Sequence, residues 1–236
     1  MDSKKPLPLR ALPRVFVPGA NPDAEIDLPQ EELDKLRKVL RLSPGAQIAV
    51  LPNDGSLIRC ELGPRCARPL EVVHPETEPA LFLTLAQALP KGDKLDQIIR
   101  ACTEIGVSRF VLFPSDRTIV RWDEKKTRDR LHRLGVIARE AAEVCFRTKL
   151  PIVEVAEGLA AVLTAEPEAV VLSEAEGAGG ALIAKAKAMT IVVGPEGGWA
   201  ERELKLIGTR GVTLGPRVLR VDHAGAAAAA ILLLGL

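Results

Sequence analysis

Aromatic residues are scarce in this chain, which has no tyrosine, two tryptophans and five phenylalanines among its 236 residues. A groove that stacks successive bases of a single strand needs many aromatic side chains, so the composition argues against one. The formal net charge is only +1, which gives no sign of a strongly basic nucleic-acid binder. Composition alone therefore points away from RNA and DNA.

Cysteine and histidine are also few. The four cysteines are scattered without a CxxC pair or a histidine at zinc spacing, and they are Cys60, Cys66, Cys102 and Cys145. We therefore expect no metal site and no disulfide framework. The histidines lie in three different segments, as His74, His132 and His223, and no Ser–His–Asp set accompanies them. We interpret each as structural or exposed rather than catalytic.

Long apolar stretches are missing as well. The longest, residues 224–236, is shorter than the ~20 residues needed to cross a bilayer, and it reads as a buried C-terminal helix. The first residues lack the apolar core of a signal peptide. We therefore expect a cytoplasmic protein without a membrane partner.

Charge is present but unevenly distributed. Residues 90–150 carry 14 Lys and Arg against nine Asp and Glu, whereas residues 151–236 carry seven against ten. Within the basic segment, cations crowd one stretch: Arg117, Arg121, Lys125, Lys126, Arg128, Arg130, Arg133, Arg139, Arg147 and Lys149. Such a run is either a solvated helix face or a strip that contacts phosphates, with an affinity that falls steeply with salt.

The first 75 residues have the pattern of a small β-rich domain. Short apolar runs separated by turn signals predict strands at residues 46–51, 56–62 and 69–74, after a helix at residues 30–42. This spacing is typical of a small barrel or sandwich. The polar, proline-bracketed stretch Pro75–Pro79 then marks a domain boundary, which we place after residue 75.

From residue 76 onward, strand and helix patterns alternate, which predicts an α/β domain with a mostly parallel sheet. The predicted strands are residues 81–86, 109–113, 170–172 and 190–193, and the predicted helices are residues 93–105, 123–145, 181–188, 200–207 and 223–234. In the first of these helices the apolar residues fall on one face, and Gly106 follows it as the terminating residue.

Three glycine-bearing loops follow strands of this second domain. They are Ser173–Gly177, Gly194–Gly198 within the sequence VVGPEGGW, and the segment LGPRVLR at residues 214–220. In open α/β sheets, ligands bind outside the carboxyl ends of the strands, where glycine allows close approach. One such loop is often only a tight turn, but three together indicate a small-molecule site. None matches a GxGxxG or Walker sequence.

Charged residues accompany these loops. Glu174, Glu196 and Asp222 are candidate acids or bases, although carboxylates beside turns are more often solvated or capping residues. Arg217 and Arg220 could clamp a carboxylate or phosphate, or they could pair with Glu196 or Asp222.

At this point five segments resemble one known family. They are RKVLRLSPG (37–45), ACTEIGV (101–107), REAAEVCFR (139–147), VVGPEGGW (192–199) and LGPRVLR (214–220), the last followed by an alanine-rich helix. In this order the chain resembles, nearly end to end, the ribosomal RNA small subunit methyltransferase E family of the SPOUT class. The resemblance implies methylation of N3 of a uridine in 16S rRNA (uracil-1498 in the family's rRNA nomenclature) with S-adenosylmethionine.

The resemblance also implies a fold and partners. It implies a PUA-like β-barrel that binds RNA at residues 1–75, and a SPOUT α/β methyltransferase domain with a C-terminal trefoil knot at residues 76–236. The implied partners are 16S rRNA or the assembled small ribosomal subunit, and a second copy of the chain in a homodimer; DNA is not expected.

The family's knot loops hold the cofactor, and they map onto the three loops described above. The implied cofactor-binding residues are Leu172, Ser173, Glu174, Val193, Gly194, Pro195, Glu196, Gly197, Gly198, Leu214, Gly215, Pro216, Arg217, Val218 and Leu219. We expect Arg147 and Arg220 to contact the RNA, and Asp222 or Glu143 to orient the base or remove its proton.

The sequence departs from the family pattern in two places. Val144-Cys145-Phe146 stands where the family has a glutamine and small residues, and Asp222-His223 stands where it has a glutamate and a small hydroxyl residue. These departures affect base positioning more than cofactor binding. Two other hypotheses are an RNA-binding module without catalysis and an enzyme acting on a small nucleotide-like metabolite, which has no need of the basic segment.

Overall fold

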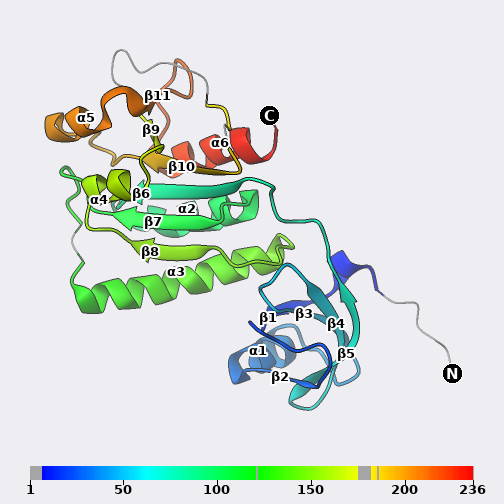
Figure 1. Cartoon of the computed structure of the whole chain (residues 1–236). Helices are drawn as coiled ribbons and strands as arrows, with labels where there is room; N and C mark the ends of the chain where they lie inside the picture. Colours follow the sequence, from blue (N-terminus) through cyan, green and yellow to red (C-terminus); the bar gives the residue numbers. More distant parts are fainter. Residues whose placement is uncertain (1–6, 121, 175–181, 185, 236) are drawn as a thin grey trace. The chain divides into compact units, whose positions relative to one another are not determined.

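The computed structural model describes residues 7–120, 122–174, 182–184 and 186–235. The chain forms two compact units (Figure 1). The first unit consists of Met1–Glu78 together with Ala142–Leu150, and the second consists of Pro79–Ala141 and Pro151–Leu236. The boundary was expected after residue 75, as a single division of the chain. The first unit also includes residues 142–150, which a single boundary does not assign to it.

The first unit contains a five-stranded sheet in the order β1-β3-β4-β5-β2. Its strands are β1 (Arg14–Phe16), β2 (Ile26–Asp27), β3 (Gln47–Leu51), β4 (Leu57–Leu62) and β5 (Cys66–Val73). The pairs β3–β4, β4–β5 and β2–β5 are antiparallel, whereas β1 pairs with β3 in parallel. The three strands expected from the apolar runs are confirmed; β1 and β2 were missed because three and two residues give no periodicity.

One helix covers this sheet. It begins as α1 (Gln30–Asp34) and continues as a π-helical turn, η2 (Lys35–Val39), so it ends before the expected residue 42. Its apolar side chains Leu33 and Leu36 are buried against strand residues such as Ile48 and Val50. A short 3-10 turn, η1 (Leu9–Ala11), precedes β1.

The segment 142–150 packs into the same unit. Ala142 is buried beside Phe16 and Leu51, and Leu150 donates its backbone N–H to Asn53 at 2.7 Å. The helix α3 (Glu124–Val144) ends in this segment and is followed by a left-handed residue, Phe146 (φ 68°), where glycine is usual.

The second unit is built on a six-stranded parallel sheet in the order β11-β9-β10-β6-β7-β8. Its strands are β6 (Phe82–Ala88), β7 (Arg109–Phe113), β8 (Ile152–Val155), β9 (Val170–Leu172), β10 (Ala188–Val193) and β11 (Gly211–Val212). All strands point the same way, so the loops that follow them meet at one edge of the sheet.

Helices cover both faces of this sheet (Figure 1). The helices are α2 (Lys94–Ile105), α3 (Glu124–Val144), α4 (Leu159–Ala165), α5 (Glu201–Ile207) and α6 (Val221–Leu233), with a 3-10 turn η3 (Gly208–Arg210) after α5. α2, α3 and α6 share one apolar core with the sheet, and α4 and α5 share the other. The predicted α/β architecture is confirmed.

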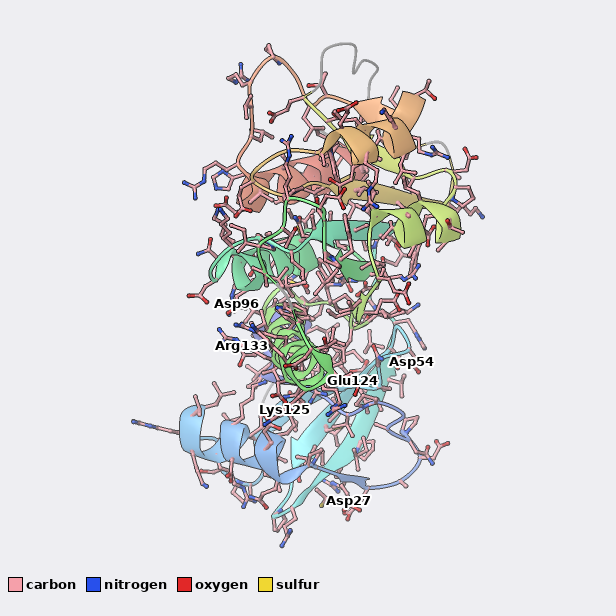
Figure 2. All side chains as sticks on the ribbon, turned by 90° about the vertical axis from the view of Figure 1, so that its left-hand side faces the viewer. Asp27, Asp54, Asp96, Glu124, Lys125 and Arg133 are labelled. Atoms are coloured by element: carbon pink, nitrogen blue, oxygen red, sulfur yellow. The ribbon has the colours of Figure 1, made fainter. Side chains whose placement is uncertain are left out.

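α2 shows why the apolar pattern located these helices well. Its buried residues lie on one face, and it ends at Gly106, whose φ of 117° requires glycine. On its outer side Asp96 forms an ion pair with Arg133 of α3, and Figure 2 shows the two side chains pointing toward one another. Burial on one face and charge pairing on the other therefore join α2 to α3.

Three elements of this unit were not predicted, and one predicted helix is not confirmed. β8 and α4 lie in a stretch where no element was predicted, and the two-residue strand β11 was also missed. A helix was predicted at residues 181–188; of these, 181 and 185 lie outside the described residues, and 182–184 and 186–187 are not helical. β10 begins at Ala188 instead.

Candidate cofactor pocket

A pocket of about 540 Å³ lies at the carboxyl edge of the parallel sheet, where the loops after β9, β10 and β11 meet. Most of the predicted cofactor-binding residues line it: Leu172, Ser173, Glu174, Val193, Gly194, Pro195, Glu196, Gly198, Leu214, Arg217, Val218 and Leu219. Gly197, Gly215 and Pro216 belong to the same loops but are not among the lining residues. The structure therefore brings together the described residues of the three loops that the sequence analysis singled out; residues 175–177 of the first loop lie outside the described part of the chain.

The loop after β10 is fixed at its end by Trp199. The indole packs so closely on Gly194 that a Cβ atom there would lie 2.9 Å from the ring. The ring stacks on Phe113, with 6.5 Å between centroids, and its N–H donates to the carbonyl of Leu172 at 3.1 Å. Gly194 is therefore required by a close approach, and Trp199 joins the loops after β9 and β10.

Glu196 is held by the N-terminal region of α2. Its carboxylate accepts hydrogen bonds from Lys94 Nζ at 2.7 Å and from the Lys91 backbone N–H at 3.0 Å. Burial alone would raise the pKa of Glu196, but these hydrogen bonds outweigh it and the pKa is lowered. Glu196 is thus an ionised anchor of the loop and a weak proton acceptor.

Arg117 reaches the middle of the same loop. It lies in the segment after β7, and its Nη1 donates to the carbonyl of Gly197 at 2.7 Å. Gly198 next to it has a φ of 68°, and its N–H closes a turn onto Pro195 at 3.0 Å. Arg117 also lines the pocket.

The loop after β11 runs into the N-terminus of α6. Gly215 has a φ of 122°, and the Thr213 hydroxyl donates to its carbonyl at 2.9 Å. Arg220, Val221 and Ala224 line the pocket where the helix begins. Part of the loop that precedes α6 is exposed to solvent, since Val218 is 75% accessible.

Asp222 lies beside the pocket, between the side chains of Arg220 and His223. Its side chain is only 9% exposed, and its carboxylate accepts a hydrogen bond from Arg220 Nε at 3.2 Å and lies 3.7 Å from His223 Nε2. Burial would raise the pKa of Asp222, but its own backbone N–H and the Arg220 side chain dominate and lower it. Asp222 is therefore ionised at neutral pH.

The other two predicted catalytic residues, Glu143 and Arg147, belong to the first unit. Glu143 is buried, forms an ion pair with Lys35 and accepts the backbone N–H of Phe16 at 3.3 Å; burial raises its pKa despite Lys35. Arg147 is 4% exposed and donates two hydrogen bonds, of 2.8 and 3.1 Å, to Glu78. Both side chains therefore engage partners within the first unit.

Other kinds of site are not evident in the part of the chain that the structure describes. It contains no group of three or more His, Cys, Asp or Glu residues placed to hold a metal ion. None of its helices is both long enough and apolar enough to cross a membrane.

Comparison with known proteins decides the family. A family profile described as an RNA methyltransferase domain matches residues 77–233. A Bacillus subtilis protein named ribosomal RNA small subunit methyltransferase E is 33% identical over 214 residues, which cover 82% of this chain and 84% of that protein. The chain belongs to this family.

Solved structures agree with this membership. A ribosomal RNA small subunit methyltransferase E from Neisseria gonorrhoeae, bound to S-adenosyl methionine, is 28% identical with a TM-score of 0.84, covering 93% of this chain and 96% of that one. A methyltransferase from Legionella pneumophila with bound cofactor shares the fold, with a TM-score of 0.85 over 93% of this chain and 96% of that one at 24% identity. The predicted enzyme class and cofactor are confirmed at the level of the family.

Sequence reasoning missed several pocket residues of this family member. They are Lys94, Arg117, Trp199, Leu204, Val212, Thr213, Val221 and Ala224. Trp199 stands within the quoted VVGPEGGW segment, so its place in the motif was a usable signal. Lys94 begins α2 and Arg117 follows β7, and only the fold places them beside residues 102 and 80 positions away.

Proposed function

We propose that this protein transfers a methyl group from S-adenosylmethionine to N3 of a specific uridine in 16S rRNA. The observation that carries the proposal is the pocket at the carboxyl edge of the sheet, lined by three loops of a chain in the methyltransferase E family. The Neisseria gonorrhoeae relative holds S-adenosyl methionine, which supports the same cofactor here.

The residues of the pocket fit such a cofactor. A volume of about 540 Å³ lies in the range of small-molecule sites. Apolar residues such as Leu172, Val193 and Leu214 can cover an adenine ring, while glycines leave backbone groups accessible. Glu174 can accept hydrogen bonds from ribose hydroxyls. Bound there, S-adenosylmethionine supplies an electrophilic methyl group on a sulfonium.

The chain's own task is then alignment and proton removal. Arg220 lines the pocket, and 68% of its side chain is exposed, which suits it to hold a phosphate or base of the RNA. Asp222 is ionised and faces Arg220, so it fixes the guanidinium and can accept a hydrogen bond from the target base. Its lowered pKa makes it a weak base, which favours orientation of the uridine over proton removal.

Glu143 and Arg147 support a different role. Their buried contacts with Lys35 and Glu78 hold the C-terminal end of α3 in the first unit. We propose that they position this unit for RNA rather than touch the base. Direct contact of Arg147 with RNA stays a prediction.

The RNA surface that we propose includes α3. Its exposed cations are Lys125, Lys126, Arg128 and Arg133, and they can contact phosphates. We propose that the first unit, with its five-stranded sheet, is the PUA-like RNA-binding domain. The proposed substrate is naked 16S rRNA or the assembled small subunit, and the proposed location is the cytoplasm.

We also propose a trefoil knot and a homodimer. β11 pairs with β9 on the side away from β10, and the chain then returns in α6, which packs on the core shared with α2. This strand order and the return of the chain in α6 support a knot in this part of the domain. Large apolar side chains are exposed on α6 and the loop before it, namely Val218, Leu219 and Ile231, and they support a second copy as their partner.

The test uses labelled S-adenosylmethionine with naked 16S rRNA and with assembled small subunits, followed by mapping of the modified base. We expect label on N3 of one uridine. Asp222→Asn should lower the single-turnover rate, whereas Glu201→Gln, an exposed change on α5, should not. Label on another base, or no label with either substrate, contradicts the proposal.

A further inference from the structure

The loop after β10 is held at three points, and each holding residue comes from a different part of the second unit. Lys94 and the Lys91 N–H hold Glu196, and the Leu172 carbonyl holds Trp199. Between them the carbonyl of Gly197 accepts its hydrogen bond from Arg117. The guanidinium group of Arg117 therefore contacts the centre of the loop from outside it.

Arg117 projects from a segment that is itself fixed. Ser115 donates its hydroxyl to the buried carboxylate of Glu203 at 3.0 Å, and the Asp116 N–H donates to the same carboxylate at 3.0 Å. The buried Thr118 accepts the Ser115 N–H at 3.1 Å and returns its own N–H to the Ser115 carbonyl at 3.0 Å. Arg117 is thus an exposed side chain on a rigid segment.

The charges that line the pocket differ in their partners. The ammonium group of Lys94 is paired with Glu196, and the guanidinium of Arg220 with Asp222. Across residues 7–120, 122–174, 182–184 and 186–235, neither Arg117 nor Arg217 forms an ion pair. Of these two, Arg117 is fixed at the pocket by its hydrogen bond to Gly197, which uses one of its five N–H groups. A guanidinium fork beside a pocket is suited to a carboxylate.

We propose that Arg117 binds the carboxylate at the methionyl end of the cofactor while it holds the Gly197 carbonyl. This inference rests on the proposed function, because S-adenosylmethionine carries one carboxylate and otherwise only cationic or neutral groups. A single side chain then couples the shape of the Gly194–Trp199 loop to cofactor binding. The anion at this place could also be an RNA phosphate, and the experiment separates the two.

The experiment compares two ligands by calorimetry. S-adenosylhomocysteine carries the amino-acid carboxylate, whereas 5′-methylthioadenosine lacks it but keeps the adenosine and the sulfur. We expect Arg117→Ala to weaken S-adenosylhomocysteine by about tenfold or more, as for loss of a charge-assisted hydrogen bond, and methylthioadenosine by much less. Arg117→Lys should fall between, because the ammonium keeps the charge but lacks the planar fork of a guanidinium.

Lys205→Ala is the matched control, because it removes an exposed cation from α5 that forms an ion pair with Glu201 on the surface of the same helix. It should leave both affinities unchanged, and equal thermal midpoints should show that every variant is folded. Equal weakening of both ligands by Arg117→Ala overturns the carboxylate contact and leaves only the loop contact. No weakening, with a loss of RNA affinity and a shallower salt dependence, overturns the inference in favour of phosphate. If the wild-type protein binds neither ligand, the proposed function itself fails.

Discussion

The indole N–H of Trp199 donates to the carbonyl of Leu172 at 3.1 Å, so that one side chain joins the loops after two neighbouring strands. Phe113 stacks on the same indole from the strand β7. Trp199 itself lines the pocket and packs against Gly194, another lining residue. The shape of the pocket therefore depends on Trp199.

Trp199→Phe keeps an aromatic ring for Phe113 but removes the hydrogen bond. We expect it to lower the free energy of unfolding by about 1 kcal/mol and the affinity for S-adenosylhomocysteine by about fivefold. Urea unfolding and calorimetry measure the two effects. Trp122→Phe, at the other tryptophan of the second unit, is the control and should leave the affinity unchanged; an equal loss in both variants would refute a role specific to Trp199.

Arg147 and Glu78 should behave as a pair. Glu78 accepts hydrogen bonds from the Arg147 side chain and, at 2.8 Å, from the Thr148 N–H. Removing either partner leaves a largely buried charge, so Arg147→Ala and Glu78→Ala should each cost about 3 kcal/mol of unfolding free energy. Both should lower RNA methylation to a similar extent at a temperature where they are folded. If Glu78→Ala stays active while Arg147→Ala does not, Arg147 contacts the RNA directly.

Phe146 occupies the left-handed position that ends α3. The Arg147 N–H donates to the Ala142 carbonyl at 2.9 Å, as in a Schellman motif, and Arg14 lies 5.1 Å from the centre of the Phe146 ring. Phe146→Ala loses the ring contacts and keeps the backbone strain, whereas Phe146→Gly loses the ring and relieves the strain. We expect the glycine variant to be more stable than the alanine variant by about 1 kcal/mol in urea unfolding, which reverses their usual order.

The control is the same glycine–alanine comparison at Gly135, inside α3, between the wild-type protein and Gly135→Ala. Gly135 has open space at its Cβ position and no left-handed φ, so Gly135→Ala should stabilise the protein. If alanine is the better residue at both positions, the left-handed strain at Phe146 is not significant.

Apolar periodicity predicted the long elements well. α2 and β7 were expected within one residue of their bounds, because a one-sided apolar face and a short buried run between turn signals have few other readings. Apolar periodicity did not predict strands that are defined by their hydrogen bonds to a neighbouring strand rather than by their own composition. β11 is two residues long and is defined by its register with β9, which the sequence does not contain.

The residues of the site show the same contrast between what the sequence predicts and what depends on the fold. The glycine loops were found because each combines a strand end with residues that permit close approach, and the fold then brought them together. Arg117 has no such local signature, since its position depends on Glu203 and Thr118. Glu143 and Arg147 were placed by their motif alone, and the motif does not reveal that both are buried in ion pairs.

Glu196 should make the stability of the protein depend on pH. Hydrogen bonds from Lys94 and the Lys91 N–H outweigh burial and lower its pKa in the folded protein. A carboxyl group of this kind contributes stability above its ordinary pKa and loses that contribution as the pH falls through the lowered, folded value. Glu196→Gln removes the charge, so its deficit in unfolding free energy should be largest near neutral pH and should shrink at acid pH.

Urea midpoints of the wild-type protein and Glu196→Gln, measured from about pH 7 down to about pH 3, test this dependence. Glu201→Gln is the matched control, because its carboxylate is 86% exposed and its ion pair with Lys205 lies one helical turn away on the surface. Its effect should be small at every pH. A Glu196→Gln deficit that stays constant down to acid pH would mean that shape, and not charge, makes Glu196 an anchor. The loop after β10 would then be held chiefly by Arg117 and Trp199.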